Sequence, residues 1–227
     1  MANASQWVDK THHQIHFVEM DDNIKLEVVD WGGKGTPIVF LAGLALNAHT
    51  FDPLVSSFVE SFRVIGITRV GHGSSESRNE NYSTARLTKD IITILNKMNI
   101  ANAIFAGHSF AGGELNHLGR HFPERVKGLI YIDAIQDLNY MDSHLAVCPD
   151  LGYATIDILK YQDNFYNTQR VKNSDGSYLP YADLSVLGRF FTEEEERHYS
   201  GIAAPAIAIN HIPEQTKDFF IGLGNPT

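Results

Sequence analysis

Cysteine is nearly absent from this 227-residue chain, which contains only Cys148. A single thiol cannot form an intrachain disulfide, so the sequence is not typical of a scaffold for an oxidising compartment. Long apolar runs are absent too, because nowhere do the roughly 18 apolar residues of a membrane-spanning helix follow one another. The first residues lack the basic and apolar regions of a secretory signal. We therefore expect a cytoplasmic protein that is neither exported nor inserted in a membrane.

Positive charge is also scarce. The chain has 18 Lys and Arg residues against 27 Asp and Glu residues, which gives a formal net charge of −9 at pH 7. No cluster of basic residues offsets this balance, so phosphate backbones and anionic lipid surfaces would be repelled. We expect neither nucleic acid nor a membrane as a partner.

The chain does have enough apolar residues for one packed domain, since 43% of its residues are hydrophobic and 20% are charged. Its first third predicts three strands separated by turns, within residues 13–20, 24–31 and 37–43. The first two strands have a mixed pattern and the third is fully apolar. The chain therefore begins with strands and no intervening helix.

From residue 51 onward, helix patterns alternate with apolar strands. Apolar residues recur at helical spacing, and Ser83 is placed to cap the longest of the helices. Apolar strands alternating with amphipathic helices indicate an α/β fold with a mostly parallel sheet and helices on both faces. The predicted helices cover 51–62, 83–98 and 110–122, and the predicted strands cover 62–68, 103–107 and 126–134.

Residues 135–200 break this alternation with a stretch rich in aromatic residues and short helical patterns. An insertion of this kind between sheet strands is typical of a small helical lid. The apolar segment 204–210 then returns the chain to the sheet as a strand that we expect to be buried. We divide the single domain into a core at 1–134, a lid at 135–200 and a return to the core at 201–227.

A glycine-rich stretch, IFAGHSFAGGE, surrounds Ser109 at residues 104–114. It lacks the lysine and hydroxyl residue of a phosphate-binding loop, and a serine stands at the second glycine of a dinucleotide-binding fingerprint. It does fit a nucleophile elbow, a sharp strand-to-helix turn that needs small neighbours, here Gly107, Ala111 and Gly112. The alternative is that Ser109 only caps the next helix.

With these motifs the chain resembles the α/β-hydrolase superfamily, in particular the lidded bacterial hydrolases that include esterases and proline-iminopeptidase-like enzymes. The resemblance runs from about residue 14 to residue 210, with the sixth predicted strand followed by the lid. It depends on several motifs in the right order. Those motifs are VFLAGLALNAHTFDPL for the third strand and oxyanion loop, VIGITRVGHGSS for the fourth strand, AGHSFAGGE for the elbow and HFPERVKGLIYIDA for the sixth strand.

Two positions depart from the family pattern. Ala42 stands where the oxyanion loop usually begins with His, and Thr68 stands where the fourth strand usually ends in Asp. The resemblance implies that backbone N–H groups of Leu44 and Phe110 form the oxyanion hole, a role that needs no side chain. We expect Thr68 to alter loop bracing more than chemistry. Because Ser109 is not a carboxylate, haloalkane dehalogenase activity is disfavoured.

A serine nucleophile needs a histidine to accept its proton and a carboxylate to orient that histidine. The resemblance implies the order Ser, acid, His along the chain. Asp133, at the end of the sixth predicted strand, is our first candidate for the acid and Glu214 the second. The alternative for Asp133 is that it only braces a turn above the sheet.

The family's histidine follows an eighth strand, about 40 residues after the seventh. Only residues 211–227 follow the seventh predicted strand here, so we expect the fold to be C-terminally truncated, without the eighth strand and the catalytic histidine. His211 is a weak substitute, because it comes immediately after its strand.

The other histidines have plainer interpretations. His117 and His121 have the i, i+4 spacing of metal ligands, but no third ligand accompanies them. His12, His13 and His16 head the first strand, where we expect them to be solvated. We therefore expect no metal ion and no cofactor.

Together these residues predict a serine hydrolase that cleaves a carboxylic ester or amide of a small-molecule substrate. Ser109 would attack the carbonyl, Leu44 and Phe110 would hold the oxyanion, and Asp133 would orient a histidine from outside this chain. The alternative is a hydrolase-fold module, impaired in catalysis, that binds a ligand or partner without turnover. Neither the substrate nor the oligomeric state follows from the sequence.

Overall fold

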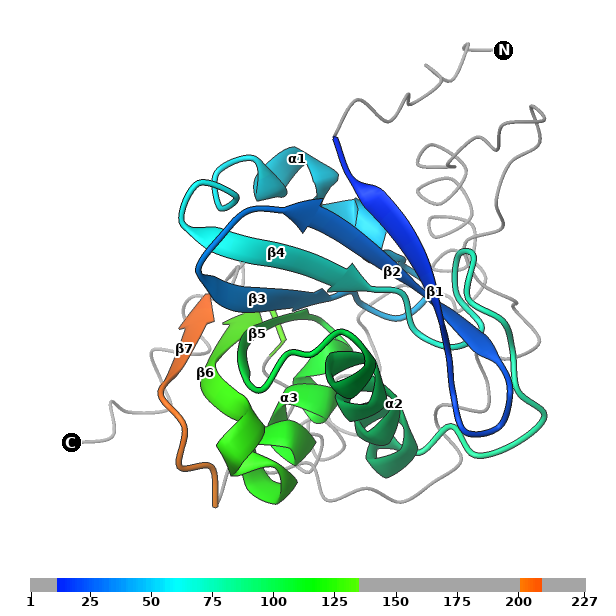
Figure 1. Ribbon diagram of the computed structural model, residues 1–227. Helices are drawn as coiled ribbons and strands as arrows, with labels where there is room; N and C mark the ends of the chain where they lie inside the picture. Colours follow the sequence, from blue (N-terminus) through cyan, green and yellow to red (C-terminus); the bar gives the residue numbers. More distant parts are fainter. Residues whose placement is uncertain (1–11, 135–200, 210–227) are drawn as a thin grey trace, which may run out of the picture.

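The computed structural model of the chain describes residues 12–134 and 201–209 (Figure 1). The predicted α/β class is confirmed, because the helices cover a mostly parallel sheet. The strands are β1 (Gln14–Glu19), β2 (Lys25–Gly32), β3 (Thr36–Leu41), β4 (Phe62–Ile67), β5 (Ala103–His108), β6 (Val126–Ile132) and β7 (Ala206–Ile209). The helical segments are η1 (Ala48–Phe51), α1 (Asp52–Val55), α2 (Thr84–Lys97), α3 (Ala111–His121) and η2 (Pro123–Arg125).

The seven strands lie in the order β1-β2-β4-β3-β5-β6-β7. β1 and β2 pair in antiparallel fashion, as do β2 and β4, whereas the pairs from β4 across to β7 are parallel. The carboxyl ends of β3, β5 and β6 therefore meet at one edge of the sheet. In folds of this kind, ligands bind at that edge.

Strand β3 shows why the sheet is covered on both faces. Successive side chains of a strand point to opposite faces, and here both sets are buried. Ile38 and Phe40 belong to the core on the side of η1 and α1, whereas Val39 and Leu41 belong to the core on the side of α2 and α3. Figure 1 shows α2 and α3 next to each other on one side of the sheet and α1 on the other.

Helix α2 forms where the apolar spacing predicts it. The Ser83 side chain caps its first turn by accepting a hydrogen bond of 3.2 Å from the backbone N–H of Arg86. Its apolar positions face the sheet, and four of them are buried: Leu87, Ile91, Ile94 and Leu95.

The helix predicted over 51–62 is wrong in extent, because α1 ends at Val55 and turns lead from there to β4. Ser56 and Ser57 follow α1, and serine side chains compete for the backbone hydrogen bonds that would extend a helix. Phe51 and Val55 are buried as expected, whereas Leu54 is exposed.

The predicted strand at 204–210 forms β7, which pairs with β6, but its expected burial is wrong. Ile207 and Ile209 are 58% and 56% exposed. β7 is the last strand of the described sheet, so its outer edge has no strand beside it within the described residues. Among the helices in that part of the chain, none is long and apolar enough to cross a membrane.

Candidate active site

Ser109 occupies the turn between β5 and α3, with a left-handed backbone at φ +52°. Residues with a Cβ atom rarely adopt such a φ, so the surrounding contacts must hold it. The Ser109 N–H donates to the Ile132 carbonyl over 3.2 Å, and its carbonyl accepts from the Gly112 N–H over 3.0 Å. This strand, turn and helix have the backbone form of a nucleophile elbow.

Left-handed residues gather at the same edge of the sheet. Of the non-glycine residues with positive φ in the described ranges, three are asparagines, a residue type that tolerates this region. The other three are Ala45, Ser109 and Asp133, with φ values of 63°, 52° and 46°. They follow β3, β5 and β6, the strands whose carboxyl ends meet. The left-handed backbone costs about 1–2 kcal/mol at Ala45 and Ser109 and less at Asp133, because aspartate tolerates this region as asparagine does. Such strain is common at functional sites.

The loop after β3 contacts the elbow at close range, and Gly43 makes this approach feasible. A Cβ atom on Gly43 would lie 3.2 Å from the Ser109 Cβ and 2.9 Å from Nδ1 of His108. Gly112 plays the same part on the other side, since its Cβ would lie 2.0 Å from the Ala134 carbonyl oxygen. The elbow is therefore held closely between the predicted oxyanion loop and the segment after β6.

Arg69, which follows β4, fastens the predicted oxyanion loop to α3. Its Nη2 donates to the Ala42 carbonyl over 2.9 Å and its Nη1 to the Gly43 carbonyl over 3.3 Å. The guanidinium also forms a buried, bidentate ion pair with Glu114 of α3: Nε lies 2.8 Å from Oε1 and Nη2 lies 2.6 Å from Oε2. It lies 5.1 Å from the ring centre of Phe110, within the range of a cation–π interaction.

His72 braces the same loop at Ala45. Its Nδ1–H donates to the Val70 carbonyl over 2.9 Å, and its Nε2 accepts the Ala45 N–H over 2.9 Å. Burial, assisted by the charge of Arg69, lowers the pKa of His72 to about 3. His72 is therefore neutral at pH 7, and its two nitrogens serve to shape the loop.

Thr68 stands where the family pattern has an aspartate, and it also braces the loop. Its hydroxyl accepts the Ala48 N–H over 3.1 Å and donates to Oε2 of Glu27 over 2.6 Å. Glu27 is buried in β2. A carboxylate from a neighbouring strand is thus linked to the loop through the threonine.

The predicted oxyanion donors and acid lie on the segments that follow β3, β5 and β6. Leu44 follows Gly43 in the loop, and Phe110 precedes the first residue of α3. Asp133 comes directly after β6; its side chain is exposed, and its N–H donates to the Ile209 carbonyl over 2.7 Å. Glu214, the second candidate for the acid, lies outside the described residues.

No histidine in the described ranges is shown bonded to Ser109, and several have other partners. His108 is adjacent in sequence; burial lowers its pKa while Asp133 opposes that shift. His117 contacts the Thr88 hydroxyl at 2.8 Å, and its ring centre lies 4.2 Å from that of His121 at a tilt of 33°. His211 lies outside the described part of the chain, as does the predicted lid at 135–200.

Sequence reasoning missed a polar cluster on η1 and α1. His49 Nδ1 lies 3.1 Å from Asp52 Oδ2, and both side chains are buried. His13, expected to be solvated, is only partly exposed, and its ring centre lies 5.1 Å from that of His49. The i, i+3 spacing of His49 and Asp52 was the one local signal that could have indicated the pair.

Comparison with known proteins agrees with this architecture. The family model described as alpha/beta hydrolase fold matches residues 36–193. A non-heme chloroperoxidase of Burkholderia pyrrocinia is 33% identical over 101 residues, which are 44% of this chain and 36% of that protein. A bifunctional esterase/perhydrolase of Acinetobacter calcoaceticus is 26% identical over 125 residues, 54% of this chain and 45% of that protein.

Among solved structures, E-2-(acetamidomethylene)succinate hydrolase matches with a TM-score of 0.67 at 19% identity. That match covers 87% of this chain and 80% of the hydrolase. At this sequence identity it supports a shared fold and nothing more. The chain belongs to the α/β-hydrolase fold family. It spans less than half of the length of the two curated relatives. A closer relation to the esterase and proline-iminopeptidase-like group stays a prediction.

Proposed function

We propose that this chain carries the nucleophile of a serine hydrolase that cleaves a carboxylic ester or amide of a small molecule. The observation that supports this most directly is the left-handed backbone of Ser109 at the turn from β5 to α3. A serine that only capped α3 would have no need of that conformation, because N-cap residues have ordinary extended backbone angles. The strain is explained if the turn must present the hydroxyl above the sheet edge.

In the proposed reaction, the Ser109 Oγ forms a bond to the substrate carbonyl carbon while its proton passes to a histidine. The carbonyl oxygen becomes an oxyanion, which the N–H groups of Leu44 and Phe110 stabilise. The proton then passes to the leaving group as the carbon–oxygen or carbon–nitrogen bond breaks, and water releases the acyl group. Asp133 orients the histidine and stabilises its charged form.

The bracing of the loop supports the same roles. Arg69 donates hydrogen bonds to the carbonyls of Ala42 and Gly43, so the peptide groups of that loop have a fixed orientation. A preorganised donor stabilises an oxyanion far better than one that must reorient during the reaction. The loop is also joined to α3 through Glu114, so its distance from the elbow is constrained at both ends.

We assign the general base to a residue outside the described part of the chain. His72 uses both ring nitrogens to hold the loop, and His49 lies between buried carboxylates. The name of one curated relative, a bifunctional esterase/perhydrolase, favours ester hydrolysis. The acid in this proposal is Asp133, with Glu214 as the alternative.

A fluorophosphonate probe tests the proposal, because the Ser109 Oγ would displace fluoride and form a stable bond to phosphorus. We expect labelling of one peptide, residues 104–114 by mass spectrometry, and its loss in Ser109→Ala. Ser57→Ala is the matched control, since Ser57 is an exposed serine far along the chain from the elbow. Equal labelling of all three proteins would contradict the nucleophile assignment.

The base and acid are tested by the labelling rate. Ala is introduced at the three histidines outside the described ranges: His144, His198 and His211. A large drop in rate for one variant would identify the base in this sequence. Slow labelling that none of them changes would agree with the expectation that the base lies elsewhere. If one of these histidines is the base, Asp133→Asn should reduce the rate strongly, because Asp133 acts only through that histidine, and Glu214→Gln should not; the reverse result would assign the acid to Glu214. A folded protein with no labelling at all would favour the binding-module alternative.

A further inference from the structure

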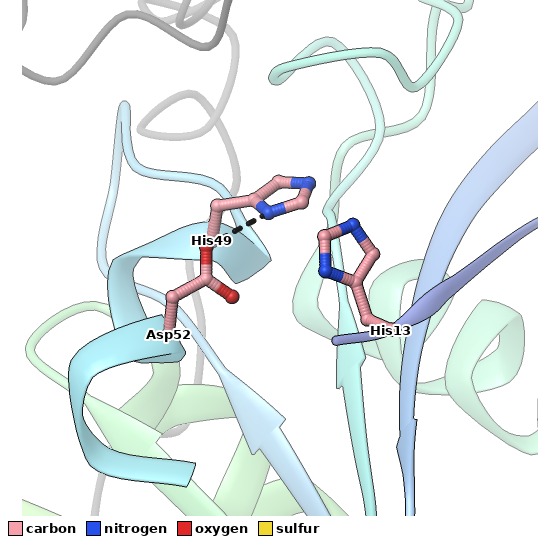
Figure 2. Close-up of side chains that lie close together, drawn as sticks. All are labelled: His13, His49 and Asp52. Atoms are coloured by element: carbon pink, nitrogen blue, oxygen red, sulfur yellow. Dashed lines mark hydrogen bonds and ion pairs between the residues drawn. The ribbon is translucent and has the colours of Figure 1, made fainter. Parts of the chain in front are cut away.

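A second group of chemically competent side chains lies where the start of β1 meets η1 and α1. One nitrogen each of His13 and His49 and one carboxylate oxygen of Asp52 all lie within 4.8 Å of one another. Figure 2 shows His13 facing the other two residues from the opposite side. None of these groups has a part in the proposed hydrolase chemistry.

Local structure explains how two of the three donors come to share a face. η1 is a 3₁₀ helix, which has three residues per turn, so residues i and i+3 lie one above the other. His49 and Asp52 have this spacing, and the 3.1 Å contact between them follows. The Trp31 Nε1–H donates to Asp52 Oδ1 over 2.8 Å and fixes the carboxylate, which leaves Oδ2 directed at His49.

The buried negative charge in this region favours binding of a cation. Asp52 and Glu27 are 3% and 1% exposed, and Glu27 Oε1 lies 3.9 Å from His49 Nε2. Two buried carboxylates need compensating positive charge. A divalent ion would balance the charge of both carboxylates.

We propose that His13, His49 and Asp52 bind a divalent transition-metal ion, with Zn²⁺ as the best match to the donor set. Two imidazole nitrogens and one carboxylate oxygen are common Zn²⁺ ligands, and three protein ligands leave a fourth position for water. In a tetrahedral site with bonds of about 2.0–2.1 Å, donor atoms lie about 3.3 Å apart. The donors must therefore close by no more than about 1.5 Å. His13, partly exposed and just before β1, is the ligand that can move.

The bound ion would tie the start of β1 to the helical turn that follows the oxyanion loop. His49 is two residues after Asn47, and η1 packs on the same side of the sheet as Trp31 and Phe40. The bound ion would therefore restrain that loop from the side away from α3. This inference is independent of the proposed function, because it needs no reaction at Ser109.

Zn²⁺ titration by calorimetry tests the site with the metal alone as the probe. All proteins carry His121→Ala, which removes the i, i+4 pair of His117 and His121 as a competing site. We expect one Zn²⁺ per chain in the parent protein, with proton release because a ligating imidazole must be neutral. His13→Ala should weaken binding roughly 100-fold or more, since even outer-shell changes cost about 10–100-fold. His16→Ala, an exposed histidine three residues away, should bind like the parent.

Co²⁺ in place of Zn²⁺ gives a spectroscopic readout. His13→Cys should retain binding and add a sulfur-to-cobalt charge-transfer band in the near ultraviolet, which appears only if residue 13 is a ligand. The buried positions are tested by His49→Gln and Asp52→Asn, with circular dichroism to establish that each variant is folded. Absence of stoichiometric Zn²⁺ binding by the parent at 100 μM metal would overturn the proposal. Equal affinities for His13→Ala and His16→Ala, or a His13→Cys protein without the new band, would do so too.

Discussion

Two adjacent glycines of α3 give the sharpest test of the packing around the elbow. Replacing Gly112 with Ala adds a methyl group whose carbon would lie 2.0 Å from the Ala134 carbonyl oxygen. The same change at Gly113 meets nothing closer than the Thr84 hydroxyl at 3.6 Å, an ordinary contact. Both glycines have helical backbones, so a methyl group costs no backbone strain at either position.

The two substitutions should therefore have opposite signs. Ala is favoured over Gly in a helix by about 1 kcal/mol, which should stabilise Gly113→Ala by roughly 0.5–1 kcal/mol. At Gly112 the same gain is offset by overpacking, which typically costs about 1–3 kcal/mol. A backbone carbonyl cannot rotate away as a side chain can, so we expect the upper end, a net loss of about 2 kcal/mol. The variants should differ by about 3 kcal/mol.

Urea unfolding followed by tryptophan fluorescence measures this difference. With a slope of about 1–3 kcal/mol per molar urea, the midpoints of the two variants should be about 1 M or more apart. Gly112→Ala should also slow fluorophosphonate labelling of Ser109, because α3 has to move away from the segment after β6. If both alanine variants gained stability equally, the contact between α3 and Ala134 would not be as close as described, and the reasoning would fail.

Two further predictions concern the bracing of the loop. Because the pKa of His72 is lowered to about 3 in the folded protein, its contribution to stability is complete above pH 6.5 and is lost as the pH falls toward 3. At about pH 5 the loss is about 2 kcal/mol. The variant His72→Gln should be less stable at pH 6.5, but its free energy of unfolding in urea should fall less between pH 6.5 and 5 than that of the parent protein. Parallel falls in the two proteins would contradict this prediction. Arg69→Met should cost about 3–5 kcal/mol by leaving Glu114 buried without its partner, and adding Glu114→Leu should recover a good part of that loss. Strictly additive effects in this double-mutant cycle would show that the ion pair is not coupled.

Much of the fold could be predicted because its signals are local. The spacing of apolar residues over α2 and the capping serine before it depend on interactions within one or two helical turns. The elbow is local as well, since Ser109 and its small neighbours lie within a few residues of one another. The order of strands and helices then follows from alternation along the chain.

The predictions that were wrong concern segments whose extent or burial depends on their place in the sheet and not on the local apolar pattern. Apolar residues at helical spacing continue to Phe58, yet the chain turns after α1, where Ser56 and Ser57 compete for backbone hydrogen bonds and β4 begins at Phe62 beside β3. Segment 206–209 is as apolar as a central strand, yet it lies at the edge of the described sheet with exposed isoleucines. Composition measures how apolar a strand is, whereas its place in the sheet decides how much of it is covered.

The sequence by itself determined which segments become strands and helices, and which serine stands at the elbow. Tertiary structure alone decided the partners of the polar side chains. Arg69 meets Glu114 across 45 residues of sequence, and His72 meets Ala45 across 27. His13 reaches His49 because β1 pairs with β2, β2 pairs with β4, and β4 lies beside β3, the strand that leads to η1. Such pairs leave no periodic trace in the sequence, since each is set by strand order and by the need to compensate charge once water is excluded.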